Sequence, residues 1–375
     1  MTREIMSTQL AVKVDHKELK EIIKLYYRAK KALFIWGPPG IGKSATVRQA
    51  AQELAQEMNL KYSEDIEHIN NEEYFIVLDI RLSQLDPSDL RGLPVFNQEK
   101  KVTQWLPPEF FPRKGKGIIF CDELNLAPPL VQGSAYQLIL DRRLGSYKVP
   151  EGFSLIAAGN RLEDKANVFK MARPLENRFG HVELIKSVEL WTEWALKNGI
   201  SPDIVGFIQF RSKLLFQFDP NNKSAAQPTP RTWHFASDLL KQLPKNASLE
   251  LKRKVVASVV GEGPATEFIN FLRLRNELKP VDYYLKNPEK CELPDETRID
   301  VLWALLTSIV EWYRDHKTNE NLRKIVKLLN RVREEYEVFT LRMMAAEDPQ
   351  LLKRFLVIPE GTELAKKLRK FLSAY

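Results

Sequence analysis

The feature that most constrains how this chain can fold is a glycine-rich loop with the pattern Gly-x-x-x-x-Gly-Lys-Ser. Its residues are Gly37, Pro38, Pro39, Gly40, Ile41, Gly42, Lys43 and Ser44. The loop directly follows the apolar run Ala32 to Trp36 and directly precedes the helical pattern of Ala45 to Met58. A strand, a glycine-rich turn and a helix in this order predict a phosphate-binding loop.

The residue types of the loop suit that task. Gly40 and Gly42 let the backbone curl, so that amide hydrogens from Gly40 to Ala45 converge on phosphate oxygens at the positive end of a helix. Pro38 and Pro39 have no amide hydrogen and stiffen the entry to the loop. We therefore expect the whole loop, together with Ala45, to bind a nucleotide.

Two side chains of the loop and two acids later in the chain predict hydrolysis. Lys43 is expected to reach the β and γ phosphates, and the Ser44 hydroxyl to ligate Mg²⁺. The apolar run Gly117 to Cys121 leads into Asp122, placed to hold the hydrated Mg²⁺, and Glu123, placed to activate the attacking water. The competing explanation is two acids that simply begin a loop. No guanine-reading Asn-Lys-x-Asp stretch occurs, which favours ATP over GTP.

The first half of the chain alternates short apolar runs with helical patterns, as βαβ units do. The runs are apolar on successive residues, which predicts strands covered on both faces. We therefore predict an α/β fold with a five-stranded parallel sheet. The runs are Ala32 to Trp36, Tyr74 to Ile80, Gly117 to Cys121, Phe153 to Ala158 and His181 to Ile185.

The second half is predicted to be all helix. Ser201-Pro202 and Thr229-Pro230 are helix-start signatures, and Gly199 can end a helix. We predict a nucleotide-binding core over residues 1–185, a helical lid over 186–285 and a helical C-terminal extension over 286–375. Apolar residues at helical spacing predict one long amphipathic helix, which packs on its neighbours or forms a coiled coil. They are Leu322, Ile325, Leu329, Val332, Tyr336, Phe339 and Met343.

Composition limits the class of protein. The apolar and charged fractions, 44% and 28%, are those of a soluble globular chain. The longest apolar stretch, Val301 to Val310, is too short to cross a bilayer, and the charged N-terminus predicts no signal peptide. Only Cys121 and Cys291 occur, which favours a reducing, cytoplasmic location. The net charge of +8 permits a polyanionic partner, but acids are interspersed, so nucleic acid is the less favoured partner.

Taken together, these elements resemble the AAA+ superfamily of ATPases. In that superfamily the fourth strand ends in a polar residue near the γ phosphate, the sensor 1 position. The run Leu155 to Gly159 is followed by Asn160, so the resemblance implies that Asn160 is sensor 1. Taken alone, an Asn that ends a strand is an ordinary turn residue.

The same resemblance assigns an arginine finger. In AAA+ rings an arginine before the fifth strand reaches the γ phosphate bound by the neighbouring subunit. Arg178, followed by Phe179, matches the family pattern best, and Arg173 is the alternative. An ordinary salt bridge with Glu176 is the competing explanation for either arginine. The finger implies a homo-oligomer, a hexameric ring by analogy.

Arg231 stands out on physical grounds. It follows Thr229-Pro230 and so lies in the first turn of a predicted helix, where a cation opposes the helix dipole. A bound phosphate would remove this conflict, and the sensor 2 arginine on the lid of AAA+ proteins occupies a similar place. The alternative is a surface arginine that points to solvent.

Three segments resemble the MoxR group of AAA+ proteins. They are Asp86 to Leu90, Asp122 to Asn125 with Ala127 to Pro129, and Leu144 to Pro150. In that group the first lies in an insertion near the pore of the ring, and the third belongs to a hairpin before sensor 1. Leu126 and Arg161 stand where the group usually has Arg and Pro, which indicates a divergent branch.

The MoxR resemblance implies a chaperone that remodels a protein partner, one with a von Willebrand factor A domain. A ring motor that acts on nucleic acid is the alternative. A nucleotide-gated scaffold with little turnover is disfavoured, because Glu123, Asn160, Arg178 and Arg231 would then have no task.

Overall fold

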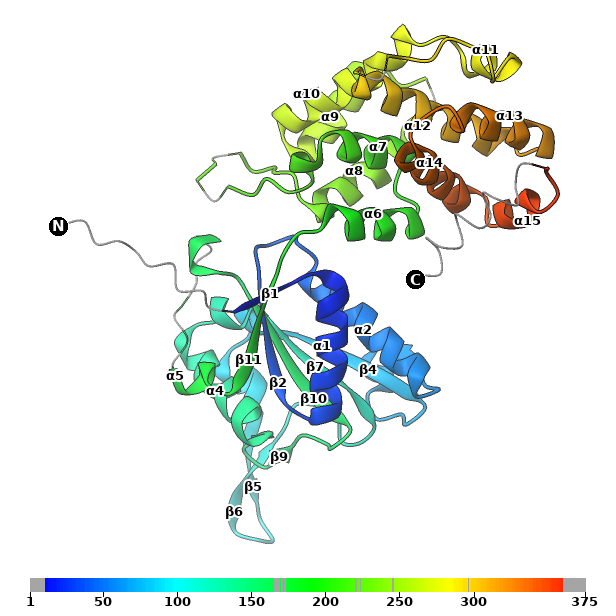
Figure 1. Ribbon diagram of the computed structural model, residues 1–375. Helices are drawn as coiled ribbons and strands as arrows, with labels where there is room; N and C mark the ends of the chain where they lie inside the picture. Colours follow the sequence, from blue (N-terminus) through cyan, green and yellow to red (C-terminus); the bar gives the residue numbers. More distant parts are fainter. Residues whose placement is uncertain are drawn as a thin grey trace. The chain divides into compact units, whose positions relative to one another are not determined.

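The computed structural model describes residues 11–359, apart from 165–168, 170, 172, 220, 223, 245 and 296. The chain divides into two compact units, each with its own hydrophobic core. The first comprises Met1–Ser187 with Asp219–Asn221, and the second Val188–Phe218 with Asn222–Tyr375. Strands that form a sheet belong to the first unit and the long run of helices to the second (Figure 1).

The first unit is built on one seven-stranded sheet, in the order β1-β11-β2-β10-β7-β4-β3, in which every neighbouring pair is parallel. The strands are β1 (Val12–Val14), β2 (Ala32–Trp36), β3 (Lys61–Ser63), β4 (Tyr74–Arg81), β7 (Lys116–Asp122), β10 (Phe153–Gly159) and β11 (Phe179–Leu184). All five predicted strands are confirmed. The predicted number of five is wrong, because β1 and β3 add one strand at each edge. Both have only three residues, of which one at most is buried, so they lack an apolar run.

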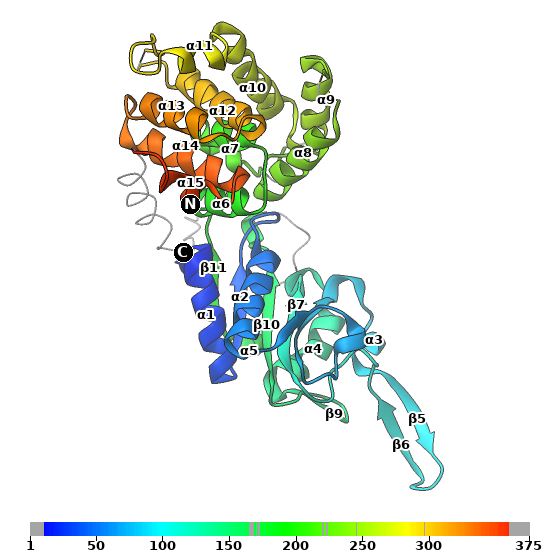
Figure 2. The same cartoon turned by 90° about the vertical axis from the view of Figure 1, so that its right-hand side faces the viewer.

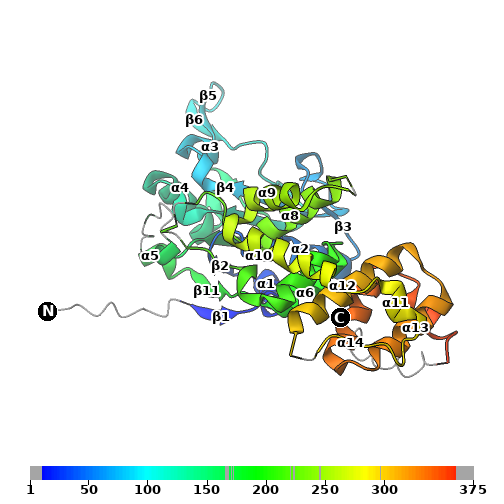
Figure 3. The ribbon, with the colours of Figure 1, turned by 90° about the horizontal axis from the view of Figure 1, so that it is seen from above.

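Helices cover both faces of this sheet (Figures 1 and 3). On one face lie α1 (His16–Ala29) and α2 (Lys43–Glu57), which contact β10, β2, β4 and β7. On the other face, α4 (Pro129–Asp141) packs its apolar side chains against those of β2, β4, β7 and β10, and α5 (Arg173–Glu176) lies beside α4. This two-sided cover explains why the central strands are apolar on successive residues.

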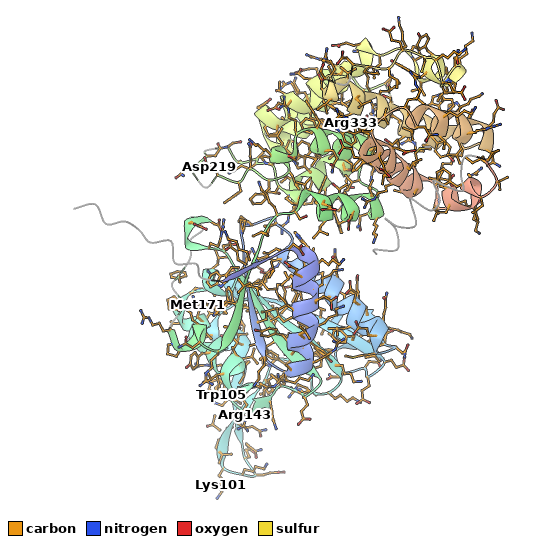
Figure 4. The ribbon with its side chains drawn as sticks, viewed as in Figure 1. Lys101, Trp105, Arg143, Met171, Asp219 and Arg333 are labelled. Atoms are coloured by element: carbon orange, nitrogen blue, oxygen red, sulfur yellow. The ribbon has the colours of Figure 1, made fainter. Side chains whose placement is uncertain are left out.

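Two hairpins lie outside the main sheet. After the short helix α3 (Pro87–Arg91), β5 (Leu93–Asn97) pairs with β6 (Val102–Leu106) in a hairpin that projects from the sheet unit (Figure 2), with Lys101 at its tip (Figure 4). The smaller hairpin pairs β8 (Arg143–Leu144) with β9 (Tyr147–Lys148), and Ser146 Oγ donates to the backbone oxygen of Trp105 at 2.7 Å. The larger hairpin was not predicted. Apolar residues occupy both of its faces, so the one-sided alternation of an ordinary strand is missing.

Within the described residues, every regular element of the second unit is a helix. Its helices are α6 (Val188–Lys197), α7 (Pro202–Phe210), α8 (Pro230–Gln242), α9 (Leu249–Val260), α10 (Glu262–Arg273), α11 (Val281–Lys286), α12 (Ile299–Asp315), α13 (Asn319–Leu329), α14 (Glu334–Glu347) and α15 (Leu351–Phe355). The predicted starts at Pro202 and Pro230 are confirmed, and Thr229 caps α8 through the amide of Thr232. Short 3-10 helices, Ile66–His68, Leu82–Gln84, Leu124–Leu126, Leu162–Asp164, Ser212–Leu215 and Leu274–Glu277, join the longer elements.

The prediction of one long helix from Leu322 to Met343 is wrong. The helix ends at Leu329, and α14 begins at Glu334. The guanidinium of Arg331 donates to the carbonyl oxygens of Pro288 and Cys291, both at 2.8 Å, which holds the connecting turn. Helical spacing continues across the break because both helices bury their apolar faces in the same core. No helix in the described part of the chain is long and apolar enough to span a membrane.

Candidate active site

The glycine-rich loop connects β2 to α2 at the carboxyl edge of the sheet. Gly40 and Gly42 have φ angles of 78° and 111°, in the left-handed region that favours glycine. In the first turn of α2, the Thr46 amide donates to the Gly42 oxygen at 2.9 Å. Among the described residues, the amides of Ser44 and Ala45 have no acceptor, so they remain available to a ligand.

The sheet brings the loop lysine to the predicted sensor. Lys43 Nζ donates to the carbonyl oxygens of Gly37 at 2.5 Å and Pro38 at 3.1 Å, and to Asn160 Oδ1 at 3.1 Å. Lys43 and Asn160 are 117 positions apart in the chain. They meet because β2, which leads into the loop, and β10, which leads into Asn160, are neighbours in the sheet. An ammonium group held between carbonyl oxygens and an amide oxygen is placed to bind a phosphate that enters the loop.

The predicted magnesium ligands also lie together. Ser44 Oγ donates to Asp122 Oδ2 at 2.8 Å. A hydroxyl and a carboxylate are hard oxygen ligands of the kind that Mg²⁺ takes, usually together with several waters. In the described part of the chain no group of three His, Cys, Asp or Glu side chains could hold a metal ion alone. This arrangement therefore fits a cation that is shared with a phosphate.

Asp79, on β4, adds a negative charge beside this pair and was not predicted. Arg48 binds its Oδ2 at 2.7 Å, while Oδ1 is buried with no hydrogen-bond partner among the described residues. Burial raises the pKa of Asp79, and the charge of Asp122 raises it further. A nearby divalent cation would relieve this crowding of carboxylates. The sequence could have indicated Asp79 as a site residue, because it is an acid within the otherwise apolar strand Tyr74–Arg81.

Glu123 lies directly after β7 in an unusual backbone conformation. Its φ of 56° is in the left-handed region, which is costly for a residue other than glycine and often marks a functional site. Its Oε2 accepts a hydrogen bond from Ser83 Oγ, in the turn that follows β4. Ser83 was not predicted as a site residue. Its place after a strand that neighbours β7 could have indicated it, because the carboxyl ends of parallel strands meet at one edge.

Asn125 holds Asn160 in place. Its side chain is only 2% exposed, donates to the Asn160 carbonyl at 2.7 Å and accepts from the Asn160 amide at 3.1 Å. Both backbone groups of Asn160 are thereby satisfied, so the strand end that carries its side chain is fixed. The sequence provided no reason to expect a buried Asn at this position.

Replacing Gly159 by Ala is expected to disturb this clamp. An added Cβ would lie 2.2 Å from Asn125 Oδ1, so Asn125 or the strand must move. Overpacking of this kind costs about 1–3 kcal/mol of unfolding free energy. We expect ATP turnover to fall more than ATP affinity, because Asn160 moves while the loop keeps its amides. Gly133→Ala is the matched control, since its Cβ would meet nothing within 4 Å. Equal denaturation midpoints and turnover rates in the two variants would contradict the clamp.

The three arginines that were predicted to contact nucleotide, Arg173, Arg178 and Arg231, are all exposed. Arg173 begins the short helix α5 and Arg178 lies two residues after its end; both are exposed, and neither forms an ion pair with Glu176 or any other described acid. The salt-bridge explanation is therefore not supported by the described residues. Arg231 lies in the helical unit, exposed in the first turn of α8 and without a described partner. Its contact with nucleotide remains a prediction.

Two other residues near the site have structural roles. Arg161, directly after Asn160, pairs with Asp164 at 2.7 Å and with Glu183 of β11 at 2.8 Å, and so links two neighbouring segments. Cys121 is 1% exposed, and burial raises the pKa of its thiol to about 12. Cys121 is therefore a core residue and not a nucleophile at neutral pH.

Comparison with known proteins finds one matching family model and several structures of low similarity. Residues 32–179 match the AAA domain of the dynein-related subfamily. No curated protein sequence matches the chain. Among solved structures, NtrX from Brucella abortus is 13% identical, with 94% of this chain and 67% of NtrX covered and a TM-score of 0.38. A variant of RuvB from Thermotoga maritima is 15% identical, with 73% and 76% covered and a TM-score of 0.36.

Proposed function

We propose that this chain, whose residues 32–179 form an AAA domain, is a magnesium-dependent ATPase that remodels a protein partner. The observation that carries the proposal is the joining of Lys43 to Asn160 and of Ser44 to Asp122 at one edge of the sheet. A plain phosphate-binding site needs neither pairing. Together with the hydrogen bond from the Glu123 amide to Asp122, they support one shared site for Lys43 and the candidate metal ligands.

Each residue has a distinct task in this proposal. Lys43 and the loop amides from Gly40 to Ala45 bind the β and γ phosphates. Ser44 and Asp122 would hold Mg²⁺, which neutralises charge on the phosphates when bound. Glu123 orients the attacking water and accepts its proton, and Asn160 keeps that water and the γ phosphate in line.

The proposed site is completed from outside this sheet unit. Arg178, or in its place Arg173, reaches the nucleotide of a neighbouring copy, and Arg231 reaches the γ phosphate from the helical unit. The chain then works as a ring, a hexamer by analogy with its AAA+ relatives, in the cytoplasm. Residues 186–285 act as the lid, and residues 286–375 form an extension.

The chemistry of the larger hairpin supports a protein partner. Leu93, Phe96 and Leu106 are each more than half exposed, and Val95, Val102 and Trp105 are also exposed. At the base of the hairpin lies an open groove of about 560 Å³, lined by Leu85, Leu93, Val95, Leu106, Pro108 and Phe110 among others. Exposed apolar surface of this extent is typical of a protein-binding site, whereas a polyanion needs clustered Lys and Arg. The MoxR resemblance proposes a partner with a von Willebrand factor A domain.

The proposal is tested by turnover and by salt dependence. We expect ATP hydrolysis that EDTA abolishes and Mg²⁺ restores, with no steep binding of DNA or RNA. Micromolar, nucleotide-dependent binding of DNA, weakened about 10³-fold or more between 50 and 200 mM salt, would favour the nucleic-acid motor instead. Absence of turnover in the assembled protein with Mg²⁺ and ATP would overturn the ATPase proposal itself.

A further inference from the structure

His181 of β11 joins two parts of the sheet unit that belong to different active sites in the proposed ring. Its Nδ1 lies 3.0 Å from the indole nitrogen of Trp36, and its Nε2 lies 2.7 Å from the carbonyl oxygen of Glu176. Trp36 ends β2, and Glu176 ends α5. His181 lies outside the matched residues 32–179, and none of the roles proposed above involves it.

The two partners determine the protonation of the imidazole. An indole N–H can only donate and a carbonyl oxygen can only accept. Nδ1 of His181 must therefore be the unprotonated nitrogen, and Nε2 must carry the proton. Because both ring nitrogens are engaged in hydrogen bonds, the imidazole bridges its two partners in one fixed tautomer.

Each end of this bridge touches the catalytic machinery. On one side, Trp36 directly precedes Gly37, whose carbonyl oxygen accepts from Lys43 at 2.5 Å. On the other side, Glu176 stands two residues before Arg178, in a turn that the Arg178 amide closes on the Leu175 oxygen at 3.1 Å. The loop that binds this subunit's nucleotide and the turn that carries the candidate finger are thus connected through one side chain.

Packing keeps the imidazole where it is. Its ring centroid lies 5.9 Å from that of Phe34, 6.0 Å from that of Trp36 and 6.2 Å from that of Phe179. β11 and β2 are neighbours in the sheet (Figure 1), with His181 opposite Phe34 in register. Rigid support of this kind matters because a misplacement of about 1 Å can reduce a catalytic rate about 10²-fold.

We propose that His181 is a positioning residue that holds the Arg178 turn against the strand leading into the phosphate loop, so that Arg178 is presented to the neighbouring copy. This inference rests on the proposed function, since it requires a finger that acts in trans. A positioning role for His181 differs from a general stabilising role in one respect. Loss of the bridge impairs the neighbour's hydrolysis while the subunit's own loop still binds nucleotide.

The test uses mixed rings of the full-length protein. An acceptor with Arg178→Ala retains its phosphate loop but supplies no finger. A donor with Lys43→Ala supplies the finger but hydrolyses nothing itself. A second donor carries Lys43→Ala with His181→Phe, which keeps an aromatic ring and removes both hydrogen bonds. We expect the first donor to restore turnover and the second to restore at least about 10-fold less. The single variant His181→Phe should bind a fluorescent ATP analogue within about twofold of the unmodified protein.

A matched control separates lost bonds from lost packing. Trp36→Phe removes only the indole donor and some volume, and it should weaken the donor in the same direction as His181→Phe. Trp191→Phe removes the same volume from a buried indole whose nitrogen has no hydrogen-bond partner among the described residues, so it should leave the donor intact. Trp36→Phe also keeps the test decisive if the His181 variant does not fold.

The outcomes separate the positioning role of His181 from the proposed arginine finger that acts in trans. If the Lys43→Ala donor fails to restore turnover, the trans arrangement is wrong, and the role of His181 falls with it. If that donor works and the His181→Phe and Trp36→Phe donors work equally well, the trans arrangement stands and the positioning role is wrong. A large loss of ATP binding in His181→Phe alone would also overturn the positioning role, because the defect would then lie in the subunit's own loop.

Discussion

Glu123→Gln is expected to abolish ATP hydrolysis while the protein still binds ATP and assembles. The amide keeps the size of the carboxylate and an oxygen that can accept from Ser83, but it cannot take a proton from water. Loss of a general base lowers the rate about 10²–10⁴-fold. ATP affinity by titration calorimetry and particle mass by light scattering should not change, because the phosphate-binding groups lie on the loop and α2.

The matched control is Glu151→Gln, an exposed acid in the turn before β10. It makes the same chemical change away from the site, so it should leave turnover unchanged. Two results would count against the role of Glu123. Turnover within about tenfold of the unmodified protein would assign water activation to another group. A parallel loss of ATP binding would mean that Glu123 supports the structure of the site instead.

Arg178→Ala is expected to lower turnover about 10³-fold or more, the contribution typical of an arginine finger. The guanidinium is exposed and has no acidic partner among the described residues, so its removal should leave the unfolding free energy nearly unchanged. Turnover is measured on the assembled protein at saturating ATP. Mixing with Lys43→Ala subunits should restore part of the activity, because each variant supplies what the other lacks.

Arg173→Ala, at the first residue of α5, serves as the comparison. If Arg173→Ala causes the large loss and Arg178→Ala does not, the two assignments are exchanged. Full turnover by a dilute monomer of the unmodified protein would contradict any finger in trans. In that case Arg173 and Arg178 would be surface residues, and the ring would have another purpose.

The sequence was sufficient where chemistry and local order coincide. A strand, a Gly-rich turn and a helix must be consecutive to bind phosphate, so Gly37 to Ser44 and the five central strands were correctly predicted. The positions of Asp122 and Glu123, at the end of a buried strand, were predicted for the same reason, and their roles stay predictions. Short-range sequence patterns gave wrong element boundaries where tertiary packing determines the secondary structure. The edge strands β1 and β3 were missed, and the apolar spacing from Leu322 to Met343 concealed a break.

Only the tertiary structure decided which distant residues meet. Ser83 contacts Glu123, Asn125 clamps Asn160, and His181 bridges Trp36 to the Arg178 turn, because parallel strands far apart in the chain lie next to one another in the sheet. Strand order is set by how helices cover the two faces, and no local sequence pattern records it. The sequence by itself therefore determined the strand, glycine-rich loop and helix from β2 to α2, for which phosphate binding stays a prediction. The structure decided which polar groups surround that loop, because their hydrogen bonds form only once the sheet is assembled.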